Sequence, residues 1–267
     1  MAQLGAFWST LGADKWPHVD DTMQLPVLKE RFGDEIEWNI PQLQLMISDG
    51  QSHRLLLRNA SKTRMVQIQN SRLVLNWTGD SGGGYPRYEV LRAEFSALLD
   101  QLASFLEHIK LPAPKFDQWE VTYLNQVPRL GLWSKASDAT FFEPLHSLPS
   151  QIQGCELEDV STAIAFVIPE KRGRLHVSMR RGMRQPGQEV LKLCGPTPGH
   201  SETIQSSPEV FVFDFTARGP LPDGEETPKD RLLQGLDLGR ETIVRSFRDM
   251  MSVEANQYWG SHDGCTV

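Results

Sequence analysis

Leu73-Val-Leu-Asn-Trp77, followed by a glycine-rich break and by Tyr85-Pro-Arg-Tyr-Glu89, is the stretch of sequence that decides the fold. The first segment has the apolar residues of a strand. Beyond Pro86, apolar residues recur at steps of three, four and five positions, which predicts a long helix over about 86–109. A strand over 117–126 follows. Strand, loop, helix and strand therefore succeed one another in this part of the chain.

Further strands are predicted in two groups, each of which precedes a long helix. Apolar residues between turn residues place strands at about 42–48, 53–59, 64–69 and 72–78, and again at about 157–168, 173–180, 188–195 and 209–217. The loop Gly219–Gly224 then leads into a second helix with an apolar stripe. Leu73–Ile109 and Val210–Met251 have the same order of elements: a strand, a loop and a helix. The chain could therefore contain an internal duplication or could lack one, and the sequence leaves both alternatives open.

These elements predict an α+β fold in which antiparallel sheets are each backed by a long amphipathic helix, with two similar halves as one alternative. Leu4, Phe7, Trp8 and Leu11 are spaced as on one face of a helix, so the chain is expected to begin with one. The expected ranges are an N-terminal helix and turn-rich connector at 1–41, a first half at 42–128, a linker at 129–150 and a second half at 151–267. Phe141 and Phe142 in the linker are expected to pack back on the body.

Composition excludes several classes of protein. The 267 residues contain no run of about 18 apolar residues, so no transmembrane helix is predicted. The net charge of −7 argues against a dedicated nucleic-acid binder. The three cysteines, Cys155, Cys194 and Cys265, lie far apart, and the first residues lack the pattern of a signal peptide. We therefore expect a reducing, cytoplasmic setting without a membrane partner.

Patterns for catalysis or cofactor binding are weak. The sequence has no HExxH, HxH or GxSxG motif, so no metal, cofactor or catalytic residue is predicted. Asp237 and Glu241 would share a helix face, but Arg240 and Arg245 beside them favour a salt-bridged surface. Gly79–Gly84 precedes a helix as phosphate loops do, yet it lacks the lysine that completes such a loop. An enzyme is therefore the less favoured interpretation.

A group of polar residues in the central motifs is the candidate ligand site. In the structural interpretation, these polar side chains stabilise local structure. A carboxylate in the first turn of a helix, for example, offsets the helix dipole. In the functional alternative, the group lines the mouth of a groove between the sheet and the helix 86–109. The residues are Asn76, Tyr88, Glu89, Tyr123 and Asn125.

The basic segment Lys171–Arg184 is the candidate anion site. Apolar and polar residues alternate within it, which predicts a strand with a cationic face. An edge strand protected by charge is one interpretation, and an anion or RNA contact is the other. The segment has no aromatic residue to stack on bases, so nucleic acid is the weaker alternative. The candidate residues are Arg174, Arg180, Arg181 and Arg184.

Several motifs carry a family resemblance. Leu-Asn-Trp, Tyr-Pro-Arg-Tyr-Glu and Glu120-Val-Thr-Tyr-Leu-Asn-Gln-Val-Pro128 resemble a sporadically distributed, uncharacterised prokaryotic family of about this length. Leu236–Phe247 followed by Trp259-Gly260 is similar to its closing segment. Members of that family begin with a strand before Phe-Trp, which is expected to be missing here. The missing strand would mean either a shortened start or a sheet with an exposed edge.

These observations lead to two functional hypotheses. The first is a non-enzymatic cytoplasmic binding or interaction protein, with a protein partner, a homodimer or a small molecule in the sheet–helix groove or on an edge strand. The family's sporadic distribution implies an accessory role in genome conflict, such as phage defence. The second is a small-molecule sensor or enzyme with its site in the groove around the Tyr-Pro-Arg-Tyr-Glu and Tyr-Leu-Asn-Gln-Val-Pro motifs.

Overall fold

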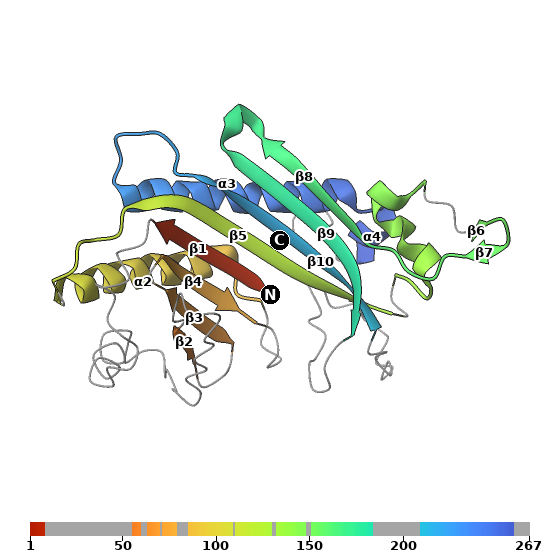
Figure 1. The fold of residues 1–267 in the computed structure, drawn as a ribbon, viewed down its shortest axis with the longest axis horizontal. Helices are drawn as coiled ribbons and strands as arrows, with labels where there is room; N and C mark the ends of the chain where they lie inside the picture. The colour runs from red at the N-terminus through yellow and green to blue at the C-terminus, as the bar shows by residue number, and fades with distance from the viewer. Residues whose placement is uncertain are drawn as a thin grey trace.

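Eight strands form one antiparallel sheet in the order β2-β3-β4-β1-β5-β10-β9-β8 (Figure 1). The computed structural model describes residues 1–8, 55–59, 63–69, 71–78, 85–108, 110–129, 132–147, 151–183 and 209–258. The strands of this sheet are β1 (Ala2–Trp8), β2 (Leu55–Arg58), β3 (Arg64–Gln69), β4 (Arg72–Trp77), β5 (Phe116–Pro128), β8 (Thr162–Ile168), β9 (Gly173–Met183) and β10 (Glu209–Pro220). A separate two-stranded sheet contains β6 (Gln151–Ile152) and β7 (Cys155–Glu156).

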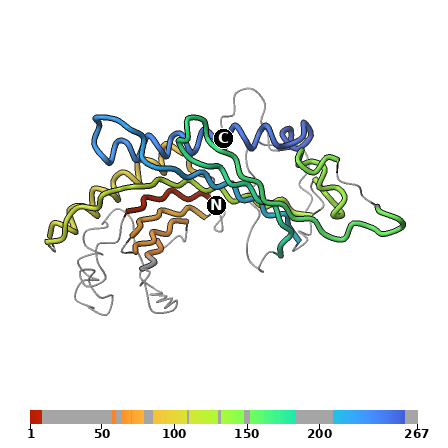
Figure 2. The backbone as a smooth tube through the Cα atoms, turned by 45° about the horizontal axis from the view of Figure 1, so that its top comes forward, coloured from red at the N-terminus to blue at the C-terminus, as the bar shows by residue number. Residues whose placement is uncertain are grey.

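Two long helices, α2 (Tyr88–His108) and α3 (Pro228–Met250), pack on this sheet. α2 lies against β1 and β4, and α3 lies along β5 and β10, on one side of the sheet in Figure 2. The remaining helices are short: η1 (Ala136–Phe141), η2 (Glu143–Leu145), η3 (Pro169–Lys171) and α4 (Val253–Tyr258). The α+β class predicted from the sequence is therefore confirmed.

Local sequence explains where the long helices begin and end. The Thr227 hydroxyl accepts a hydrogen bond from the Asp230 backbone N–H at 3.1 Å, and Pro228 occupies the first turn of α3. After α2, Lys110 adopts a left-handed φ of 60° and Pro112 follows shortly. Both boundaries lie close to those that the sequence indicates.

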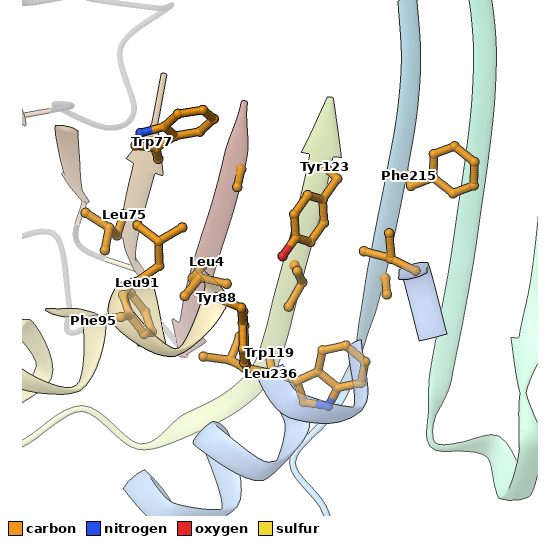
Figure 3. Close-up of a cluster of buried hydrophobic side chains, with 14 of the residues drawn as sticks. Leu4, Leu75, Trp77, Tyr88, Leu91, Phe95, Trp119, Tyr123, Phe215 and Leu236 are labelled. Carbon is orange, nitrogen blue, oxygen red and sulfur yellow. The ribbon is translucent and has the colours of Figure 1, made fainter. Parts of the chain in front are cut away.

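The core lies between the helices and one face of the sheet. Leu4 and Leu75 from the sheet meet Leu91 and Phe95 from α2 (Figure 3). Under α3, the Trp119 ring is fully buried, because the helix presents glycine to it at two positions. An added Cβ at Gly239 would come within 2.7 Å of the Trp119 ring. The close contact between α3 and β5 therefore depends on small residues in the helix.

The N-terminal helix predicted from Leu4, Phe7, Trp8 and Leu11 is wrong, since Ala2–Trp8 form the strand β1. Ala2, Leu4, Ala6 and Trp8 are all buried, and this two-residue period is that of a strand. β1 pairs with β4 on one side and with β5 on the other, so it lies inside the sheet. Residues 2–8 therefore form an internal strand of the sheet, in place of the helix that was expected there.

Two other expectations need correction. β1 pairs directly with β5, so the sheets expected for the two halves are joined in one continuous sheet. The strand expected at 157–168 begins only at Thr162.

Within the expected linker, Phe141 and Phe142 pack on Phe213 with ring centroids 5.9 and 5.3 Å away. The strands expected at 42–48 and 188–195 and the loop Gly79–Gly84 lie outside the described residues.

Candidate functional site

The two faces of the sheet carry different side chains. Trp119 and Val121 point toward α3, where a Cβ at Gly239 would meet both. Residues paired across antiparallel strands share a face, and successive residues alternate between faces. Glu120 and Thr122 therefore point away from α3 and from α2. We call this second side the helix-free face, because no helix of the described ranges packs on it.

A row of polar residues crosses the helix-free face. The pairing registers connect five of them on neighbouring strands: Asn76, Gln3, Thr122, Thr216 and His176. Asn76 and Thr122 have only 4% and 7% of their surfaces exposed. A buried polar group costs free energy unless it is hydrogen-bonded, and both of these side chains have partners, Asn76 in the Met65 carbonyl and Thr122 in the Thr216 hydroxyl.

A hollow of about 320 Å³ lies at the β8 end of this row. Its walls include Ala163 and Ala165 on the edge strand β8, which pair with Ser178 and His176 on β9. These small side chains leave space beside the longer ones of the neighbouring strands. The polar lining residues are His176, Ser178, Asp214 and Thr216. This volume is at the lower end of the range for small-molecule sites.

A chain of hydroxyl groups in this region ends on Asp214. The Thr216 hydroxyl donates to Asp214 Oδ1 at 2.8 Å, and its oxygen lies 2.8 Å from the Thr122 hydroxyl. Because a hydroxyl has one proton to donate, Thr122 is then the donor to Thr216. No basic side chain of the described residues forms an ion pair with Asp214. The carboxylate therefore retains acceptor capacity beside the hollow.

His176 contributes a further polar atom. Its Nε2 is buried and has no hydrogen-bond partner in the described part of the chain. Ser178, His176 and Asp214 are the residue types of a nucleophilic triad, but no hydrogen bond among the described contacts joins any two of them. A serine nucleophile is activated by a hydrogen bond to its base. Among the described contacts, the three residues therefore do not form an assembled triad.

Charged residues lie next to the hollow along β9 and β10. Arg218 pairs across the strands with Glu120 on one side and with Arg174 on the other. Burial raises the pKa of the Glu120 carboxyl, while the positive charges of Arg218 and Arg72 lower it. Two arginines thus act on one carboxylate here, and Arg218 is exposed whereas Arg72 is half-buried.

Between the sheet and the long helices, where the sequence predicts a groove, lies a second polar cluster, made by Tyr85, Tyr88, Arg92, Tyr123 and Asp237. The Tyr88 hydroxyl donates to Asp237 Oδ1 at 2.8 Å, and Arg92 donates to both carboxylate oxygens at 2.7 and 2.9 Å. The hydroxyl oxygens of Tyr85 and Tyr123 are 2.9 Å apart. The Tyr88–Asp237–Arg92 contacts join α2 to α3.

Burial is the main cause that raises the pKa of each of the three tyrosines, so all three remain protonated at neutral pH. The positive charge of Arg240 opposes this shift for Tyr123, and its guanidinium lies 5.6 Å from the centre of the Tyr88 ring. The polar groups of the groove therefore bind one another. They join the helices to each other and to β5, which leaves few groups for a ligand.

The other residues of the predicted groove site are placed apart. Asn76 lies on the helix-free face, where its Nδ2 donates to the Met65 carbonyl at 3.3 Å. Glu89 is exposed at the start of α2. Asn125 is half-buried and pairs across the strands with Phe213. The structure thus brings Tyr88 and Tyr123 to one cluster and leaves these three outside it.

The predicted pair of carboxylates is also separated. Asp237 contacts Arg92 on α2, whereas Glu241 accepts from Arg245 at 2.5 Å one turn along its own helix. The salt-bridged alternative is therefore correct. The ion-pair partner of Asp237, however, is Arg92 on α2, and the spacing of residues within α3 does not reveal a partner on another helix.

The basic segment does not form the predicted edge strand. β9 lies between β8 and β10, because β8 pairs along its outer side. Arg174 and Arg180 are exposed on the helix-free face, but Arg181 points to the other face and forms an ion pair with Glu209. Arg129 also pairs with Glu209, and the two arginines lower the pKa of its carboxyl. Arg184 lies outside the described residues.

Sequence reasoning missed the hollow. His176 and Ser178 lie in the alternating segment whose arginines were noted, and Asp214 interrupts the apolar run Val210–Phe215. A lone carboxylate in a strand of this kind is a usable signal, because charged residues are seldom buried without a reason. Ala163 and Ala165 give no such signal, since their role depends on the residues across the strands.

The described ranges contain no group of three histidine, cysteine, aspartate or glutamate side chains placed to hold a metal ion. No helix in these ranges combines the length and apolar character needed to cross a membrane. The chain matches no family model, no curated protein and no solved structure.

Proposed function

We propose that this chain is a non-enzymatic binding protein that holds a small ligand in the hollow on the helix-free face. The observation that carries the proposal is the Thr122–Thr216–Asp214 chain, which ends on a carboxylate without a basic partner among the described residues. Binding sites combine an apolar wall with a few polar groups that fix the orientation of the ligand. Ala163 and Ala165 supply the wall, and Asp214 and His176 supply such groups.

The helix-free face is a better place for a ligand than the sheet–helix groove. In the groove, Tyr88, Arg92 and Asp237 already satisfy one another. Along the hollow, Nε2 of His176 is unpaired within the described chain. A ligand that pairs with such an atom offsets part of the free energy lost when the atom left water.

A duplicated architecture is the second part of this proposal. The first half has β1 paired with β4, and the second half has β5 paired with β10. The strand order β2-β3-β4-β1 corresponds to β8-β9-β10-β5, and a long helix follows both β4 and β10. This correspondence supports two copies of one unit that meet at the β1–β5 pair, and the ligand would then belong to the second copy.

The binding function is tested by filling the hollow. We expect protein purified gently from cells to carry a bound mass in native mass spectrometry that is lost on denaturation. Ala165→Trp places a large side chain in the hollow, so this variant is expected to lose the mass. Ala103→Trp, on the exposed side of α2, is the matched control and should keep it. An unchanged mass in Ala165→Trp, or none in the unmodified protein, contradicts the proposal.

The edge strand β8 supports a second candidate function, the binding of another protein chain. Among the described residues β8 pairs only with β9, and its sequence Thr162-Ala-Ile-Ala-Phe-Val-Ile168 has no charged residue or proline. Phe166 and Val167 are 43% and 66% exposed. Edge strands usually carry charge or proline against pairing. We propose that β8 pairs with β8 of a second copy, because antiparallel self-pairing closes a twofold dimer.

The physiological setting that we propose is cytoplasmic, with an accessory role in genome conflict. The wide spacing of the three cysteines supports the cytoplasmic setting, and the family resemblance alone supports the role in genome conflict.

A further inference from the structure

The charges around the hollow are separated along β10. Asp214 lies beside the hollow, and Arg218 follows four residues later on the same face. At about 3.4 Å per residue, their Cα atoms are roughly 14 Å apart. Arg174 lies directly across from Arg218 on β9, and the small wall of β8 runs beside this interval. The interval therefore has a carboxylate at one end and a positive end formed by two arginines, with Thr216 and His176 between them, and Arg180 lies on the same face beyond Asp214.

The positive end is poorly compensated within the described protein. Like charges directly opposite one another on adjacent strands are unfavourable, and Arg174 and Arg218 form such a pair. Glu120 lies opposite Arg218 and offsets one of the two charges. A carboxylate from a ligand fits the remaining charge, because guanidinium groups bind carboxylates through two parallel hydrogen bonds.

We infer that the ligand in the hollow is an elongated zwitterion of short-peptide length, with its ammonium on Asp214 and its carboxylate between Arg174 and Arg218. This inference rests on the proposed binding function. An extended peptide spans about 3.3–3.6 Å per residue, so three or four residues match the interval between the two ends. The Thr216 hydroxyl and the His176 ring lie where the peptide amides would pass, and Ala163 and Ala165 accommodate small side chains.

Calorimetric titration with tetra-alanine tests the inference, with the N-acetylated and the C-amidated peptides as matched probes. We expect the unmodified protein to bind free tetra-alanine, and each blocked peptide to bind about tenfold or more weakly, as the loss of a charged hydrogen bond implies. Asp214→Asn should weaken binding of the free peptide and remove the penalty of acetylation. Arg218→Gln should likewise remove the penalty of amidation.

Two exposed residues away from the hollow provide the controls. Asp223→Asn, in the loop before α3, and Arg87→Gln, before α2, should leave all three affinities unchanged. Matching thermal unfolding of Asp214→Asn and Asp223→Asn shows that a loss of affinity is not a loss of fold. Absence of tetra-alanine binding, or equal acetylation penalties in Asp214→Asn and in the unmodified protein, overturns the inference. The bound mass lost in Ala165→Trp is independent of this outcome, so the two proposals fail separately.

Discussion

At the scale of single residues, Tyr88 shows how one side chain serves both packing and polar contact. Its ring is buried to 6% exposure, while its hydroxyl donates to Asp237 on the other long helix. Arg92 holds the same carboxylate, and both members of that ion pair are partly exposed, at 35% and 44%. Solvent weakens such an ion pair, so the buried hydroxyl contributes specificity that the charges alone do not.

Tyr88→Phe is expected to lower the free energy of unfolding by about 1 kcal/mol, because it removes one hydrogen bond and keeps the ring. Urea denaturation followed by circular dichroism measures this change. Ser104→Ala, at an exposed position of α2, is the control and should change stability by less than about 0.5 kcal/mol. If Tyr88→Phe is as stable as the unmodified protein, the hydroxyl does not join the helices as we describe.

At the scale of elements, the contact between α3 and β5 depends on glycine within a helix. Gly235 and Gly239 lie over Trp119, whose ring has no exposed surface. Glycine in a helix interior costs roughly 1 kcal/mol relative to alanine. The helix tolerates this cost twice, since glycine lets α3 lie close to β5 and cover the tryptophan.

Gly235→Ala is expected to destabilise the protein by about 1–3 kcal/mol, although alanine favours the helix. The added methyl group would overlap the Trp119 ring, and the cost of that overlap exceeds the gain in helix propensity. Gln234→Ala, one residue away and exposed, should instead be neutral or slightly stabilising. Chemical denaturation of both variants measures the difference. A stabilised Gly235→Ala protein would show that α3 does not approach Trp119 this closely.

At the scale of the whole molecule, the sheet has one continuous core and ends at the strand β8. The central pair β1–β5 joins buried residues of both parts of the chain in a single cluster. The end strand β8 is apolar and exposed at Val167, which is the basis for the proposed dimer. Pairing of two such edges would extend the sheet without altering its faces.

Val167→Lys is expected to convert the dimer to a monomer, since lysine on an edge strand opposes pairing. Sedimentation velocity at several protein concentrations measures the change. Val90→Lys, at a 48% exposed position on α2, is the matched control and should leave the association unchanged. A protein that is monomeric at every concentration, or a Val167→Lys variant that still dimerises, contradicts β8 pairing.

The order of helices and strands could be predicted from the sequence wherever apolar residues recur at a regular local spacing. The boundaries of β3, β4 and α2 lie within two residues of those predicted, because alternation, capping and proline act over a few positions. The sequence predicts a helix in place of β1 because Leu4 and Trp8 fit a helical spacing and a strand spacing equally well, and only pairing with β4 and β5 distinguishes the two.

The hollow was decided by tertiary structure alone. Asp214 lies on a strand far along the chain from His176 and Ala165, and strand register brings the three to one surface. Register depends on which strands pair, and a shift of one residue would move every side chain to the other face. Local sequence therefore determined which strands carry these residues, because the period of apolar residues is local. The pairing of distant strands determined which side chains they contact.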